Sequence, residues 1–196
     1  MTIVRIAVIV FMYLIIMVTP VGVHAGETAD KVKKHYRKGR ALTAVVPRQF
    51  AAVLWNVEIL KAMADYEALR HGLHPRYVRA IAETESQWNA LALSRAGAMG
   101  VMQITPIVID ELGIHNPLCP AQNIMAGVQY IRFLAEMFNG NLSKVAAAYN
   151  AGPSRVLRIG AIPDIRETVQ FVKKVLAMVH DRERVAYYSD CRVFVN

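Results

Sequence analysis

Residues 80–106 read AIAETESQWNALALSRAGAMGVMQITP, the end of an amphipathic helix followed by a loop rich in Gly, Ala and Ser. Pro75 is typical of the first turn of a helix, and apolar residues including Ile81 then fall on one face. Glu85 lies one turn after Ile81 and shares this apolar face, whereas Glu83 points about 160° away from Glu85. We therefore expect the two glutamates to have different neighbours and not to act as a pair.

The position of Glu85 favours a neutral carboxylic acid over a carboxylate. Apolar neighbours desolvate the charged form, and the C-terminal end of a helix presents the negative end of its dipole. Raising the pKa of a glutamate from about 4.3 toward 6 takes roughly 2 kcal/mol, which partial burial can supply. Glu85 is therefore a candidate general acid. The same surroundings would also suit a structural acid that is hydrogen-bonded to a loop.

Outward from this stretch, the pattern of apolar residues is helical from Pro47 onward. Helices are expected over residues 47–70, 75–85, 106–112, 121–139, 143–150, 154–159 and 164–184, with an ordered loop at 87–103. Strand signals are nearly absent, because no alternating apolar run and no Asn-Gly hairpin between β-branched segments occurs. The sequence predicts an all-α fold, with one helical domain over residues 47–196.

Residues 1–25 have the features of a secretory signal peptide. Residues 6–18 are uncharged and almost wholly apolar, and residues 23–25 (VHA) give a small-x-small cleavage pattern. Such a run rises only about 20 Å as a helix, less than a hydrocarbon core of about 30 Å. We expect cleavage after Ala25 and a periplasmic protein; the alternative is an uncleaved membrane anchor over residues 3–23.

Charge and cysteine content narrow the function further. The 196-residue chain carries a net charge of +8, and residues 26–46 form a basic arm or linker without apolar periodicity. This arm lacks the aromatic interleaving or reading motif that nucleic-acid binding needs, so no nucleic acid is expected.

In an oxidising compartment, Cys119 and Cys191 are expected to form a disulfide bridge that stabilises the folded state by roughly 4 kcal/mol; two unpaired thiols are the alternative.

Several chemistries have no support in the sequence. His71 and His74 flank Gly72 without the spacing of metal ligands, so no metal site is expected. The chain contains no nucleophile elbow, phosphate-binding loop or GxGxxG fingerprint. We expect an activity that uses neither metal nor cofactor.

Three blocks of sequence, in order, resemble the soluble lytic transglycosylase family of bacterial murein-cleaving enzymes. They are ESQWN at 85–89 with ALSRAGAMGVMQ at 92–103, then NIMAGVQY at 123–130 with AAYNAGP at 147–153, and finally RETVQFV at 166–172. The resemblance spans about residues 73–179 and implies a goose-lysozyme-like helical domain with a groove. Two departures are Ala90, where the family often has Pro, and residues 108–109, where Thr-Ala is usual.

The resemblance implies a role for each matching residue. Glu85 corresponds to the single catalytic acid/base. Ser94 and Tyr149 correspond to residues that support the substrate and the reacting carboxyl. Met102 and Gln103 correspond to residues that line sugar subsites, and Asn150 lies beside them.

The implied reaction cleaves the β-1,4 bond between N-acetylmuramic acid and N-acetylglucosamine and closes a 1,6-anhydro ring. The acetamido group of the substrate replaces the second carboxylate that most glycosidases need.

Two alternative functions stay open: a hydrolase of the same fold, with a second carboxylate such as Asp110 or Glu111, and a non-catalytic peptidoglycan-binding scaffold. We expect glycan strands as the partner and a monomer, and the small size suggests service to a secretion, conjugation or pilus system.

Other motif residues are expected to be structural. Trp88 is predicted to pack in the core, and Glu167 to pair within its helix or cap a loop. The glycines and alanine of residues 97–100 are expected to allow tight loop packing, which shapes the groove.

Overall fold

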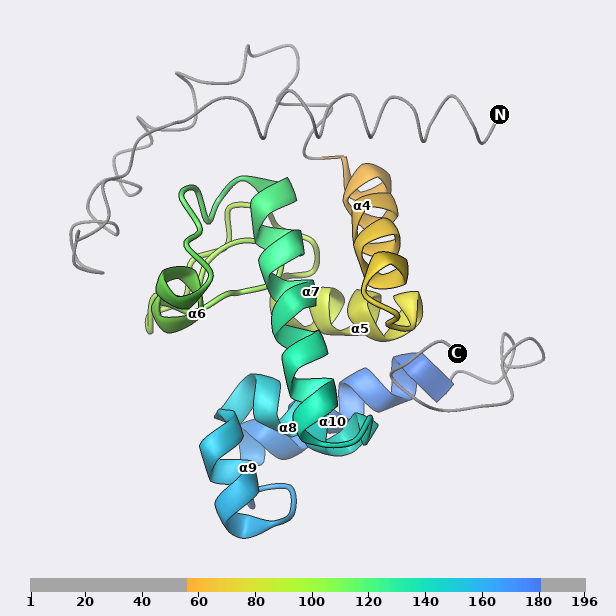
Figure 1. Ribbon diagram of the computed structural model, residues 1–196, viewed down its shortest axis with the longest axis vertical. Coiled ribbons are helices and arrows are strands. Elements are labelled where there is room, and N and C mark those ends of the chain that lie inside the picture. The colour runs from red at the N-terminus through yellow and green to blue at the C-terminus, as the bar shows by residue number, and fades with distance from the viewer. Residues whose placement is uncertain (1–55, 181–196) are drawn as a thin grey trace.

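A computed structural model describes residues 56–180 and shows seven helices in that range (Figure 1). Their bounds are α4 Val57–Arg70, α5 Pro75–Ser86, α6 Pro106–Glu111, α7 Pro120–Met137, α8 Leu142–Ala151, α9 Pro153–Ile159 and α10 Arg166–His180. The predicted all-α class is confirmed for this part of the chain. Between residues 56 and 180 the only β pairing is two isolated bridges, which join Met99 to Leu93 and to Ile104.

Each helix expected within the described range is present, with ends that differ from the prediction by a few residues. The helix ends follow local rules. Asn56 and Asn141 cap α4 and α8, because their side-chain oxygens accept from Glu58 N and Lys144 N, both at 2.9 Å. A proline begins α5, α6, α7 and α9, where its missing N–H leaves no bond unmade.

Helix α7 runs through the middle of the domain and packs against α4, α6 and α8 (Figure 1). Helix α5 packs against α4 on one side and α10 on the other, and α10 also packs against α8. The phenol of Tyr77 on α5 is buried and donates to Leu142 O at the start of α8, at 2.8 Å. This bond fixes the first turn of α5 relative to the start of α8, and α10 packs against both helices.

Asn123, fully buried on α7, holds the loop that follows α5. Its Nδ2 donates to Met99 O at 2.8 Å and to Pro117 O at 2.7 Å, and its Oδ1 accepts from Met102 N at 2.8 Å. The loop approaches so closely that a Cβ at Gly100 would overlap the Asn123 amide. The expectation that this small-residue loop packs tightly is confirmed at Gly100.

Several predictions concern residues outside the described range. The signal peptide over residues 1–25, the arm over 26–46 and Cys191 all lie there, so they stay predictions. The sequence predicts a first helix that runs unbroken from residue 47 to 70, and this is wrong: Asn56 has an extended backbone, and its side chain accepts from Glu58 N, so α4 begins at Val57. Among residues 56–180, no helix is long and apolar enough to cross a membrane.

Replacing Gly100 by Ala should destabilise the domain more than replacing Gly113 by Ala. Both glycines have positive φ, +76° and +62°, but nothing lies within 4 Å of a Cβ at Gly113. The difference between the two variants in the free energy of unfolding therefore isolates the clash with the Asn123 amide. We expect this clash to cost the Gly100 variant about 1–3 kcal/mol more. Urea unfolding of both variants measures this difference. Equal losses would mean that the loop moves away from Asn123 without cost.

Candidate active site

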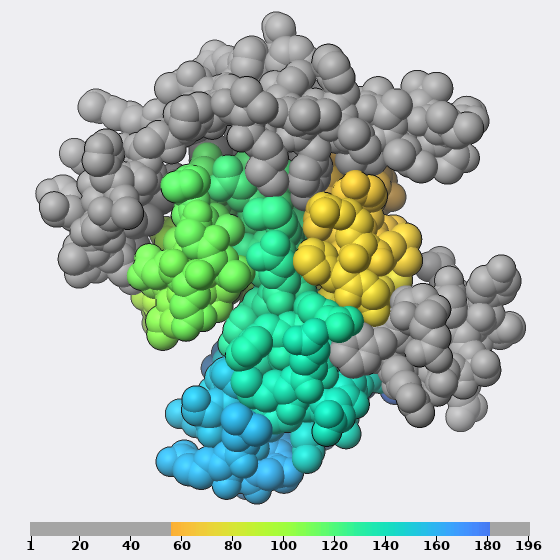
Figure 2. Space-filling model, in the orientation of Figure 1, coloured from red at the N-terminus to blue at the C-terminus, as the bar shows by residue number. Residues whose placement is uncertain are grey.

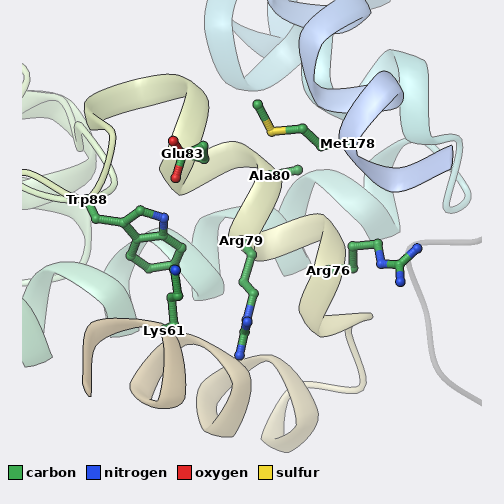
Figure 3. Close-up of a pocket in the computed structure, with 7 residues that line it drawn as sticks. All are labelled: Lys61, Arg76, Arg79, Ala80, Glu83, Trp88 and Met178. Carbon is green, nitrogen blue, oxygen red and sulfur yellow. The ribbon is translucent and has the colours of Figure 1, made fainter. Parts of the chain in front are cut away.

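Glu83 and Glu85 lie two residues apart on α5 and have different neighbours, as the helical spacing predicts. Glu83 lines a pocket that is also lined by Lys61 of α4, Met178 of α10 and the ring of Trp88 (Figure 3). Glu85 is half-buried in the last turn of α5 and lies on the side toward α8 and the start of α10, where Tyr149 and Glu167 are its electrostatic neighbours. The structure thus separates the two carboxyl groups.

Burial raises the pKa of Glu85 from 4.5 to about 8, and the nearby charge of Glu167 adds to this effect. Glu85 is therefore mostly protonated at neutral pH, which is the form a general acid needs. The sequence predicts desolvation as a cause but misses Glu167, which it assigns to a pairing or capping role. Glu167 is an exposed residue in the first turn of α10, 82 positions after Glu85, and local spacing gives no sign that the two meet.

Tyr149 on α8 is the other group that the structure brings to Glu85. Its hydroxyl donates to Met102 O at 2.7 Å, and burial together with the charge of Glu85 raises the pKa of the phenol. A phenol that stays protonated and is held by a backbone carbonyl keeps a fixed orientation. Tyr149 therefore offers a fixed polar oxygen beside the acid.

Met102 and Gln103 take different positions in the loop. The side chain of Met102 is fully buried and packs against α7, so closely that a Cβ at Gly127 would overlap it. The structure gives this side chain a packing role, and its assignment to a sugar subsite stays a prediction. The Gln103 amide is partly exposed and donates to Ala92 O at 3.2 Å and Gly100 O at 3.0 Å, which closes the loop on itself.

Ser94 and Asn150 are both half-buried. Ser94 binds the backbone of its own loop, and Asn150 binds a side chain of the neighbouring helix α10. Ser94 Oγ accepts from Ala98 N at 2.9 Å, and Asn150 Oδ1 accepts from the Thr168 hydroxyl at 2.8 Å. The second bond joins the end of α8 to the first turn of α10, which also carries Glu167. The substrate-binding roles of Ser94 and Asn150 stay predictions.

The turn after α5 contains two residues that the sequence does not single out for their backbone. Gln87 and Trp88 have φ of 52° and 65°, left-handed values that are uncommon outside glycine. The conformation is held on both sides: Ser86 Oγ donates to Val101 O at 2.7 Å, and Trp88 is only 4% exposed within the core. The prediction that Trp88 packs in the core is confirmed.

Two further candidate residues, Glu111 and Cys119, lie within residues 56–180. Glu111, at the exposed end of α6, acts electrostatically on Tyr130 rather than on the acid. Cys119 is half-buried, forms no disulfide within residues 56–180, and has a thiol pKa that burial raises. Cys191 lies outside the described residues, so the bridge stays a prediction.

The fold and this arrangement define an all-helical domain with one half-buried, protonated glutamate flanked by a tyrosine. The Transglycosylase SLT domain family matches residues 62–171. The chain therefore belongs to this family, the lytic murein transglycosylases, as its sequence blocks predict.

Individual relatives agree with this assignment. The chain is 36% identical over 124 residues to a soluble lytic murein transglycosylase of Salmonella typhimurium, covering 52% of this chain and 19% of that protein. It is 27% identical over 178 residues to a membrane-bound lytic murein transglycosylase F of Shewanella pealeana, covering 86% of this chain and 36% of that protein. The chain thus spans about a fifth to a third of the length of these relatives.

Solved structures show the same fold. An inactive mutant of the lytic transglycosylase Slt from Pseudomonas aeruginosa, with glutamine in place of a glutamate, superposes with a TM-score of 0.58 at 25% identity. That match covers 86% of this chain and 32% of the other. The 70 kDa soluble lytic transglycosylase of Escherichia coli gives a TM-score of 0.55 at 28% identity, over 69% of this chain and 25% of the other.

The raised pKa of Glu85 predicts how the stability of the domain depends on pH. Between about pH 4.5 and 8, the unfolded chain ionises Glu85 while the folded chain keeps it protonated, so this group lowers stability as pH rises. Glu85→Gln should therefore be more stable than the wild type at pH 8, and the gain should vanish near pH 4.

Urea unfolding at both pH values measures this gain. Glu83→Gln is the matched control, because it changes a carboxyl on the opposite side of α5 and leaves Glu85 in place. A gain in the Glu85 variant that is equal at both pH values would show that the carboxyl is not held protonated.

Proposed function

We propose that this chain is an exported lytic transglycosylase that cleaves the β-1,4 bond between N-acetylmuramic acid and N-acetylglucosamine in peptidoglycan and leaves a 1,6-anhydro end. The observation that carries the proposal is Glu85, which burial and Glu167 hold protonated beside Tyr149. By the resemblance of the sequence blocks, Glu85 corresponds to the acid of the family, and one protonated carboxyl is what the reaction needs at its start.

The proposed reaction uses Glu85 twice. The protonated carboxyl first donates to the glycosidic oxygen as the bond to C1 breaks, and the acetamido carbonyl of the substrate stabilises the positive charge at C1. The carboxylate then takes the proton of the C6 hydroxyl, whose oxygen bonds to C1 and closes the anhydro ring. No water is consumed, and Glu85 ends as it began.

A second carboxylate near the acid would favour the alternative, a hydrolase that activates water. The structure brings Glu167, rather than Asp110 or Glu111, into electrostatic reach of Glu85. Glu167 is exposed, and its position supports an effect on the pKa of Glu85. Product chemistry distinguishes the two reactions, because only hydrolysis leaves a reducing end.

The setting of the enzyme is proposed from the sequence. The apolar run and cleavage pattern of residues 1–25 support export to the periplasm, with a membrane anchor if the segment is retained. The basic residues 31–40 suit contact with an acidic surface. We also propose, from the family resemblance of the sequence blocks, that the enzyme opens the wall locally for a secretion, conjugation or pilus machine.

Digestion of purified peptidoglycan followed by mass spectrometry tests the activity. We expect anhydromuropeptides from the wild type, and a loss of about 10²–10⁴-fold or more in Glu85→Gln, which removes the proton donor. Glu83→Gln is the matched control and should cleave like the wild type. Reducing-end muropeptides would contradict the proposal in favour of a hydrolase. Full cleavage by Glu85→Gln would show that another residue is the acid.

Glu167→Gln should move the alkaline limb of kcat/KM to lower pH. The limb reports loss of the protonated Glu85, and without the Glu167 charge the Glu85 carboxyl ionises more easily. Asp164→Asn removes an exposed carboxylate just before α10 and should leave the limb in place. An unshifted limb in the Glu167 variant would mean that its charge does not act on the acid.

A further inference from the structure

Three aromatic rings form a row that starts beside the acid and ends in solvent. Tyr149 on α8, next to Glu85, lies with its ring centroid 5.5 Å from that of Tyr130 on α7, and the planes are tilted by 52°. Tyr130 in turn stacks with Phe133, one turn further along α7, at 6.3 Å and 17°. The row therefore leads from the catalytic carboxyl to a ring at the surface.

The row lies where two parts of the domain face one another. The charge of Glu111, at the end of α6, contributes to raising the pKa of Tyr130, so α6 reaches the ring that also meets Tyr149 of α8. Figure 2 shows the outline of the molecule indented between the green segment around α6 and the blue segment around α9. Tyr130 is thus reached by the charge of Glu111 on α6 and contacted by the ring of Tyr149 on α8.

Phe133 differs from the other two rings in its exposure. Tyr130 is partly buried against the core and Tyr149 is hydrogen-bonded to Met102 O, whereas Phe133 is 50% exposed. The stack with Tyr130 fixes its plane, so its surroundings restrict the ring without covering it. An exposed, oriented aromatic ring in line with an active site is suited to bind an apolar surface.

The faces of a pyranose ring supply such a surface, because axial C–H groups make them apolar while the hydroxyls lie around the edge. The spacing of the aromatic centroids is of the same order as the spacing of successive sugars in an extended β-1,4-linked strand. A strand whose scissile bond lies at Glu85 would therefore place a sugar more than one residue away near Phe133.

We propose that Phe133 is the stacking platform of a distal sugar subsite, which binds a pyranose of the glycan strand away from the cleaved bond. This inference rests on the proposed function. Phe133 is then a positioning residue that makes the enzyme prefer long strands, since a short fragment that occupies Glu85 does not reach it.

The test compares long glycan strands with the shortest fragments that the wild type cleaves. For Phe133→Ala, kcat/KM should fall about fivefold on long strands through KM, with kcat unchanged, and should not change on short fragments. Phe133→Trp should restore cleavage of long strands because it keeps an aromatic face. Leu69→Ala, which truncates an exposed apolar residue on α4, is the matched control and should change neither substrate.

A second readout does not depend on turnover. In the Glu85→Gln background, adding Phe133→Ala should weaken binding to purified long strands by a similar factor. Equal losses on long and short substrates, or no loss of strand binding, would overturn the platform. Absence of anhydro products from the wild type would instead overturn the proposed function, while the binding comparison would still decide the role of Phe133.

Discussion

The hydrogen bonds of Asn123 are the interaction on which the site depends. This buried amide on α7 binds two carbonyls and one backbone N–H of the loops beside it, and it satisfies groups that would otherwise be buried without partners. The loop held in this way supplies the two carbonyls that fix the site. Val101 O accepts from Ser86 at the end of α5, and Met102 O accepts from Tyr149. One side chain on the central helix therefore sets the position of the segment that lies between the acid and its tyrosine.

The acid itself is maintained at the expense of stability. A glutamate that stays protonated at neutral pH is one whose charged form is poorly solvated. The folded state is therefore destabilised relative to an unfolded chain, in which the same glutamate ionises freely. The domain tolerates this because α5 is held along its length, by α4 on one side, α10 on the other and Tyr77 at α8. The left-handed turn at Gln87 and Trp88 follows directly after Ser86, where the bond from Ser86 to Val101 O and the burial of Trp88 hold it.

The helices were predictable because their signals are local. Apolar spacing, prolines at first turns and asparagine caps all act within a few residues, and α4 to α10 appear where these signals place them. The separation of Glu83 from Glu85 follows from the geometry of one helix. The surroundings of individual side chains depend on contacts between residues far apart in the sequence, and local spacing does not predict these contacts. The sequence predicts no electrostatic role for Glu167, and it suggests a sugar-lining side chain for Met102, which the structure buries against α7.

The sequence by itself determined the all-helical class, the candidate acid and the family, because periodicity and ordered motifs are written along the chain. Only the tertiary structure decided which groups surround that acid. Glu167 and Tyr149 reach Glu85 from α10 and α8, and the row from Tyr149 to Phe133 crosses from α8 to α7. The physical reason is that desolvation and Coulomb interactions depend on distances through space, which the packing of helices sets and the spacing of residues in sequence does not.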